Sequence, residues 1–214
     1  MNRDFYKVLI VGSSGKGKSY MMRTLDKTST GYINVENQPL PFKNEFKNHE
    51  RPTTGIDTIT TLIKYAKDDS IKVIVVDSFS AYMDLVLKEA RQTKRGFDVW
   101  TEYNTKIAEF HEILNKIQKE VLVTGHYEIL DVEGTPEKRL RVHGREHEGR
   151  VERYYTVALF ADSKYDEEGK SEYFLRLSGE GISAKCPPDI FGPEVVTIPN
   201  DAKYIIDKIT EFAE

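Results

Sequence analysis

The chain has 214 residues, of which 39% are hydrophobic and 31% charged, and its formal net charge is −4. This length favours one domain over residues 1–214, and the acidic balance excludes a basic nucleic-acid coat, so a polyanion would have to meet a local basic patch. The lone cysteine, Cys186, excludes an internal disulfide and fits a reducing compartment, where we expect it to be a small structural residue. No apolar run approaches the length of a membrane span, and the apolar run near the start is too short for a signal peptide. We therefore expect a cytoplasmic protein with no membrane partner.

Apolar strands alternate with helices over the first 130 residues. β-Branched and apolar runs predict strands over residues 6–11, 31–36, 71–78 and 121–130. Helical spacing of apolar residues predicts helices from Ser19 to about Leu25, from Ile56 to Lys67, over residues 79–93 and over about 99–119. A polar loop is predicted over residues 37–54. Because the strands are apolar on both faces, they are typical of a buried parallel sheet.

The pattern changes after Tyr127, where turn signals replace helices between the strands. Gly and Pro occur within residues 131–139, and DEEG at 166–169 predicts a hairpin turn between two apolar runs. An irregular stretch over residues 182–193 precedes an amphipathic helix over 201–213. The predicted fold is α/β, with a mainly parallel sheet flanked by helices and antiparallel strands added in the C-terminal part.

The stretch GSSGKGKS fits the phosphate-binding pattern G-x-x-x-x-G-K-[ST], and it lies between a predicted buried strand and a predicted helix. Backbone N–H groups and the helix N-terminus would hold phosphate, Lys18 would reach the β- and γ-phosphates, and Ser19 would ligate Mg²⁺. A glycine-rich turn without a ligand would leave the lysine unexplained. Lys16 is at a variable position, and a solvated side chain is expected for it. The residues predicted to form the nucleotide site are Gly12, Ser13, Ser14, Gly15, Lys16, Gly17, Lys18, Ser19 and Tyr20.

Three polar residues stand at the predicted carboxyl ends of strands. Asp77 ends VIVVD and is expected beside the loop as a second Mg²⁺ ligand, with an N-cap for the next helix as the alternative. Glu36 ends YINVE and could activate the attacking water, or be a solvated strand end. His126 ends VLVTGH and could contact the γ-phosphate or its water, whereas a satisfied histidine at the rim of the core is the ordinary alternative.

In this order, the segments resemble the RecA-like P-loop NTPase core, over roughly residues 5–165. GYINVEN resembles the strand that ends in the catalytic glutamate of RecA-like recombinases, and IKVIVVDSFSA resembles their Walker B strand. EVLVTGHYEI resembles the strand leading to their polar phosphate sensor, which is usually Gln where this sequence has His126. The resemblance implies a Mg²⁺-dependent ATPase in which Lys18, Glu36 and His126 are catalytic and Ser19 and Asp77 ligate magnesium.

The chain is also similar to small phage-encoded P-loop proteins of the AAA type, among them Sak-type single-strand annealing proteins. This similarity implies a homo-oligomer in the cytoplasm of a host cell, acting on single-stranded DNA in recombination, annealing, repair or replication. A single-strand binding protein would be a further partner. The sequence shows neither the N-terminal helix and linker by which full recombinases polymerise nor a large C-terminal domain, so we do not expect filament formation by that route.

In RecA-like recombinases a mobile DNA-binding loop follows the sensor strand, and residues about 130–153 match it. Six Lys or Arg residues face four Glu residues there, a small excess of positive charge. One interpretation is contact with DNA phosphates, or an arginine finger on the γ-phosphate of a neighbouring subunit. The other is a solvated hairpin whose mixed charges give solubility. The basic residues are Lys138, Arg139, Arg141, Arg145, Arg150 and Arg153.

Three other functions are compatible with a P-loop. A nucleotide-switched adaptor that binds a protein partner needs no hydrolysis, so loss of Glu36 would leave it intact. A small-molecule kinase needs an acceptor pocket and an arginine-rich helical lid, and the antiparallel second half gives no such signal. A packaging or remodelling ring would need the helical lid domain of AAA+ motors, for which the sequence also gives no signal.

Overall fold

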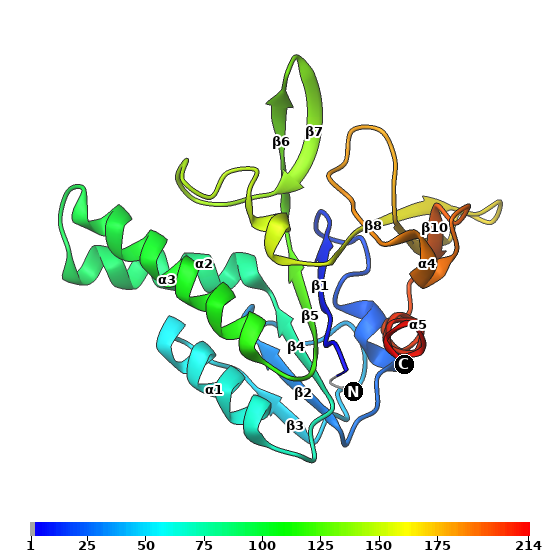
Figure 1. Cartoon of the computed structure of the whole chain (residues 1–214), viewed down its shortest axis with the longest axis horizontal. Helices are drawn as coiled ribbons and strands as arrows, with labels where there is room; N and C mark the ends of the chain where they lie inside the picture. Colours follow the sequence, from blue (N-terminus) through cyan, green and yellow to red (C-terminus); the bar gives the residue numbers. More distant parts are fainter. Residues whose placement is uncertain (1–2) are drawn as a thin grey trace.

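A computed structural model describes residues 3–214 of the chain, and an eight-stranded sheet forms its centre (Figure 1). From one edge of the sheet to the other, the strands are β10 (Thr197–Pro199), β9 (Ser171–Arg176), β8 (Val157–Tyr165), β1 (Lys7–Val11), β5 (Glu120–Gly125), β4 (Val73–Asp77), β2 (Thr30–Asn34) and β3 (Asn48–Glu50). The strands from β8 to β3 run parallel, and β9 pairs antiparallel with both β8 and β10. The predicted class is confirmed: a mainly parallel sheet with antiparallel strands in the C-terminal part.

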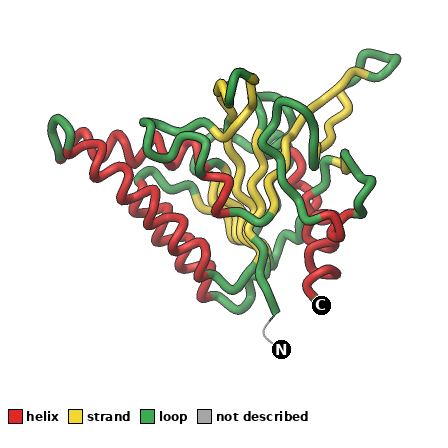
Figure 2. The backbone as a smooth tube through the Cα atoms, turned by 45° about the horizontal axis from the view of Figure 1, so that its top comes forward, coloured by secondary structure: helices red, strands yellow, loops and turns green. Residues whose placement is uncertain are grey.

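Helices cover both faces of this sheet, so the molecule has three layers (Figure 2). One face is covered by α1 (Gly55–Lys67), α2 (Phe79–Thr93) and α3 (Asp98–Lys116). The other face is covered by the 3₁₀-helix η1 (Tyr20–Thr24), the short α4 (Pro188–Phe191) and α5 (Ala202–Ala213). The central strand β1 is buried on both sides because its residues alternate between the two hydrophobic clusters.

Side-chain caps begin three of the helices where the sequence patterns predicted them. The hydroxyl of Thr54 accepts the N–H of Asp57 at the start of α1 (3.0 Å), and Ser78 caps α2 in the same way. Asp201 accepts the N–H of Tyr204 at the start of α5 (3.0 Å). Each cap satisfies an N–H group that the first helical turn leaves without a partner.

A two-stranded arm leaves the sheet directly after β5 and projects from the top of the molecule (Figure 1). It consists of β6 (Tyr127–Val132) and β7 (Thr135–Leu140) and is followed by the 3₁₀-helix η2 (Val151–Tyr154). The buried carboxylate of Glu152 accepts the N–H of Leu140 (2.8 Å) and the hydroxyl of Ser183 (3.0 Å), which ties the base of the arm to later segments. Of the stretch 130–153, predicted as a mobile loop, residues 130–132 and 135–140 belong to this hairpin and residues 151–153 to η2, whereas residues 141–150 form neither strand nor helix.

The helix predicted from Ser19 to Leu25 is only the five-residue 3₁₀-helix η1. The chain has to turn at Asp26, whose carboxylate accepts the N–H groups of Thr28 and Ser29, before β2 begins. Too few residues separate the phosphate-binding loop from β2 to hold both this turn and a longer helix.

The strand predicted over residues 121–130 is in fact two strands, β5 and β6, which belong to different sheets. β5 is buried throughout, whereas β6 has exposed positions and pairs only with β7. The predicted loop over 37–54 contains the edge strand β3, and the irregular stretch over 182–193 contains α4. β8 pairs parallel with β1, and the predicted hairpin turn joins it antiparallel to β9.

Candidate functional site

The loop between β1 and η1 holds a buried lysine. Lys18 is 8% exposed, and its Nζ donates to the carbonyl oxygens of Gly12 (2.8 Å) and Ser13 (2.9 Å). Burial lowers the pKa of Lys18 to about 8, although the carboxylates of Asp77 and Glu36 act in the opposite direction. A cation that is poorly solvated and has only neutral hydrogen-bond partners is well suited to meet an anion.

Two glycines of this loop are required by close approach of other segments. A Cβ atom at Gly12 would lie 2.9 Å from the carbonyl oxygen of Ala161 in β8. Gly17 has a φ of +82°, and a Cβ there would lie 3.0 Å from the ring of Tyr173 and from Nδ2 of Asn200. The loop is therefore packed against residues that follow it by more than 140 positions in the sequence.

The short η1 changes how the loop can hold phosphate. A macrodipole forms by summing aligned peptide units along a helix, so five residues of 3₁₀-helix contribute far less than the α-helix that the sequence pattern predicts. Attraction for an anion at this site depends mainly on the loop N–H groups and on Lys18.

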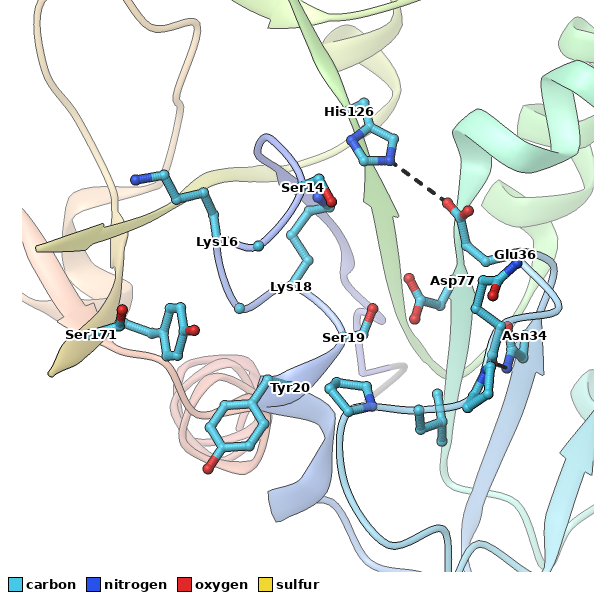
Figure 3. Close-up of a pocket in the computed structure, with 17 residues that line it drawn as sticks. Ser14, Lys16, Lys18, Ser19, Tyr20, Asn34, Glu36, Asp77, His126 and Ser171 are labelled. Carbon is cyan, nitrogen blue, oxygen red and sulfur yellow. Dashed lines mark hydrogen bonds and ion pairs between the residues drawn. The ribbon is translucent and has the colours of Figure 1, made fainter.

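Asp77 is the last residue of β4 and is 3% exposed. Its Oδ2 accepts the hydroxyl of Tyr32 (2.6 Å), and its Oδ1 accepts the hydroxyl of Thr124 (2.5 Å). Burial and the Asp77 carboxylate raise the pKa of Tyr32 well above its ordinary value, so the phenol stays a donor. Ser78 caps α2, which removes the alternative role predicted for Asp77. Figure 3 shows Ser19 and Asp77 on facing sides of a cavity.

Glu36 and His126 lie beside each other at the rim of this cavity (Figure 3). Nε2 of His126 is 3.8 Å from Oε1 of Glu36, and the Ser78 hydroxyl donates to the same oxygen. The backbone N–H of His126 donates to Oγ of Ser80 at 2.9 Å. Partial burial and the charge of Lys18 lower the pKa of His126, while Glu36 opposes this, so the imidazole is neutral at pH 7.

The cavity itself has a volume of about 570 Å³, within the usual range for small-molecule sites. It is lined by the loop residues from Ser14 to Tyr20 and by all three strand-end residues predicted to act there, Glu36, Asp77 and His126. The structure thus brings together the residues that the sequence patterns singled out separately.

Sequence reasoning missed the rest of the lining. Asn34, the last residue of β2, and residues 38–41 line the cavity, as do Ser171 and Tyr173 of β9, and the ring centre of Tyr173 is 5.8 Å from that of Tyr20. Asn200 does not line the cavity, but it is 7% exposed and donates from Nδ2 to the carbonyl of Gly17 (3.2 Å). None of these residues had a signal in the sequence, because Asn34 lay inside the strand predicted over residues 31–36, which ended at Glu36.

The side chain of Lys16, predicted to be solvated, is 32% exposed and contacts the polar end of β8. Its Nζ lies 3.0 Å from Oδ1 of Asp162 and donates to Oγ of Ser163 at 3.0 Å. The cause is the parallel pairing of β8 with β1, which places the polar end of β8 beside the loop.

The six basic residues of the arm region lie apart from this cavity; within residues 3–214 none of them lines it. Arg139 donates to the Glu137 carboxylate (2.8 Å) and to the Gly149 carbonyl (2.7 Å), and the Lys138 ammonium lies 5.1 Å from the ring centre of Tyr127. The exposed members of the set are Arg141, Arg145, Arg150 and Arg153.

Residues 3–214 contain neither a helix suited to a membrane nor a cluster of side chains suited by itself to a metal ion. None of the described helices combines the length and apolarity that a bilayer crossing requires. No group of three or more His, Cys, Asp or Glu side chains is placed to hold a metal ion without other ligands.

Comparisons with known proteins place these features in a family. The sequence profile of the AAA domain family matches residues 4–185. A nucleotide-binding protein of Thermodesulfovibrio yellowstonii is 33% identical over 119 residues, which are 49% of this chain and 41% of that protein, so the match spans less than half of either. The crystal structure of a KaiC-like protein from Pyrococcus horikoshii superposes with a TM-score of 0.49 and 11% identity, covering 82% of this chain and 79% of that one.

Proposed function

The chain belongs to the AAA domain family, and on that premise we propose that it binds ATP with Mg²⁺ and hydrolyses the γ-phosphate. The observation that carries this proposal is the convergence of Lys18, Asp77, Glu36 and His126 on one cavity. The relative from Thermodesulfovibrio yellowstonii is named as a nucleotide-binding protein, which agrees with the nucleotide part of the proposal.

The residues present fit magnesium. The Ser19 hydroxyl and the Asp77 carboxylate are hard oxygen donors, and Mg²⁺ commonly takes only one or two protein ligands together with phosphate oxygens and water. Asp77 accepts two hydrogen bonds, yet an ionised carboxylate has about four acceptor sites, so capacity for a ligand remains. When bound, the ion would neutralise charge that develops on the phosphates.

Each remaining residue has a role in the proposed hydrolysis. Lys18 would exchange its carbonyl partners for phosphate oxygens, a stronger charge-assisted interaction. Glu36, oriented by the Ser78 hydroxyl, would accept a proton from water as the water oxygen attacks the γ-phosphorus and the bond to ADP breaks. Neutral His126 would donate a hydrogen bond to the γ-phosphate or to that water.

We also propose that the protein acts on single-stranded DNA as a homo-oligomer in phage recombination, annealing, repair or replication, in the host cytoplasm and with a single-strand binding protein as a further partner. The four exposed arginines that follow the arm in the sequence support a contact with DNA phosphates. Since no arginine of residues 3–214 lines the cavity, Arg145, Arg150 or Arg153 of a second copy would supply the arginine finger. Repetition of a weak DNA contact in an oligomer would raise affinity by avidity.

The test is steady-state ATP hydrolysis, with and without single-stranded DNA, for the wild type and Glu36→Gln. We expect Glu36→Gln to lower kcat by at least about 100-fold while the Kd for Mg·ATP stays within about threefold, because the amide keeps the shape but cannot accept the proton. Glu112→Gln, at an exposed position of α3, is the matched control.

The outcomes separate the parts of the proposal. Wild-type protein that does not bind Mg·ATP contradicts the nucleotide site, and full hydrolysis by Glu36→Gln contradicts the role of Glu36. Hydrolysis that single-stranded DNA leaves unchanged contradicts the DNA role and favours a switch that binds a protein partner.

A further inference from the structure

Two tyrosines form an aromatic corner at one end of the cavity. Tyr20 directly follows the loop, and Tyr173 comes from β9, on the far side of the β8–β9 hairpin turn. Their ring centres are 5.8 Å apart, their planes meet at 55°, and both residues line the cavity. Both side chains are half-buried.

Each ring has a close contact with a neighbouring residue. The Arg23 guanidinium lies over the ring of Tyr20, with Cζ 3.8 Å from the ring centre. The ring of Tyr173 packs on Gly17 so closely that a Cβ atom there would lie 3.0 Å from it. The corner is thus supported by the phosphate-binding loop itself, and a planar ligand could bind to it without first ordering the two side chains.

The cavity is polarised along its length. Asp77, Glu36 and His126 lie at one end, and Tyr20 lies on the opposite side of Ser19 from them (Figure 3). A nucleoside triphosphate has the same polarity, because its charge is concentrated on the phosphates and its base presents a flat, poorly solvated face. A second apolar segment, Pro39 to Pro41, also lines the cavity and is the competing place for the base.

From this arrangement we propose that the nucleotide base packs in the Tyr20–Tyr173 corner, so that the β8–β9 hairpin forms the base-binding wall of the site. The proposal rests on nucleotide binding by the loop and adds the residues that recognise the nucleoside. In proteins that bind single-stranded nucleic acids, stacking of one base on an aromatic side chain changes affinity by roughly 5- to 150-fold. The corner therefore supplies affinity for a nucleoside triphosphate that a bare triphosphate lacks.

The experiment compares Mg·ATP with Mg·tripolyphosphate by calorimetry, using the full chain. Tyr173→Ala is expected to weaken ATP binding by about tenfold and to leave tripolyphosphate binding within about twofold. Tyr173→Phe keeps the ring and is expected to bind both as the wild type does. Tyr165→Ala, an exposed tyrosine at the tip of the same hairpin, controls for effects on the hairpin alone. Leu40→Ala tests the competing apolar segment.

The tripolyphosphate arm distinguishes the two ways in which the proposal can fail. Wild-type protein that binds neither ligand overturns the nucleotide site and the base wall together. Wild-type protein that binds both ligands, with an unchanged ATP to tripolyphosphate affinity ratio in Tyr173→Ala, overturns the base wall alone. A selective loss of ATP affinity in Leu40→Ala but not in Tyr173→Ala also overturns it and assigns the base to residues 39–41.

Discussion

The two flanks of the phosphate-binding loop are built in different ways. On one side, the ends of β5 and β4 present His126 and Asp77, and each follows an apolar run that is recognisable in the sequence. On the other side, β8, β9 and the segment before α5 support the loop through Ala161, Tyr173 and Asn200. The first flank is the one for which we propose the phosphate chemistry, whereas the second sets the shape of the loop by its contacts.

This difference shows where local patterns carry information about a site. A side chain at the end of a buried parallel strand has a predictable position, because the carboxyl ends of parallel strands meet at one edge of the sheet. A side chain that touches the loop from an antiparallel extension is placed only by the register of β8 with β1, which no local pattern records. The following predictions test the two flanks separately, from the largest expected effect to the smallest.

The largest effect is expected at Lys18. Lys18→Ala should weaken Mg·ATP binding by about 100-fold, because charge-assisted hydrogen bonds to phosphate are lost and the other lysine of the loop, Lys16, is paired with Asp162. Binding by the wild type should also weaken as the pH rises above 8, where the ammonium of the free protein loses its proton. Calorimetric titrations at pH 7.0, 8.0 and 9.0 measure both effects.

Lys18→Ala also serves as the control for the pH dependence. The pKa of Lys7 is lowered to about 8 as well, but Lys7 lies at the opposite end of β1 and does not line the cavity. Between pH 8 and 10.5 the folded chain binds fewer protons at both lysines than the unfolded chain does. The free energy of unfolding therefore rises with pH over this range, and the contributions of the two lysines cannot be told apart in it. Affinity for ATP separates them: a pH dependence that persists in Lys18→Ala would contradict the assignment.

A medium effect is expected at Asn200, on the second flank. Asn200→Asp keeps the size of the side chain but cannot donate to the Gly17 carbonyl, and it places a negative charge beside the loop. We expect about tenfold weaker binding of Mg·ATP, against at most about threefold for Asn200→Ala. Equal affinities in all three proteins would show that this flank does not shape the site.

The smallest effect is expected for the ion pair between Lys16 and Asp162. The two side chains are 32% and 33% exposed, and ion pairs that are partly exposed to solvent contribute little to the free energy of unfolding, because solvent screens the charges. A double-mutant cycle with Lys16→Met and Asp162→Asn should give a coupling of about 0.5 kcal/mol in the free energy of unfolding, measured in urea. A coupling above about 2 kcal/mol would mean that this contact is a main attachment of the loop.

Much of the fold was predictable because the spacing of apolar residues in the sequence shows which faces of a strand or helix are buried. The runs KVLIV and VIVVD are apolar on both faces and are buried in the sheet, and the caps at Thr54, Ser78 and Asp201 coincide with the predicted helix starts. The division of residues 121–130 into two strands at His126 was not predicted, because the change of sheet depends on pairing with β7.

The site divides in the same way. The P-loop pattern and the strand ends identified Lys18, Ser19, Glu36, Asp77 and His126 as neighbours, and all five line one cavity. Tyr173 gave no signal, since a tyrosine within an alternating strand is ordinary for core packing or for an edge. The environment of Lys16 could not be predicted without knowing that β8 lies beside β1.

The sheet order has a consequence for synthesis of the chain. β1 is among the first segments to be made, yet its two neighbours in the sheet are β5 and β8, with Lys7 opposite Val121 and Val8 opposite Val157. At about 5–20 residues per second, the ribosome needs about 6–20 s to add the residues between β1 and its first partner. The loop that follows β1 therefore emerges early but has no sheet to support it until more than half of the chain has been made. Nucleotide can stabilise the nascent protein only at that late stage, after the most distant contacts in the sheet have formed.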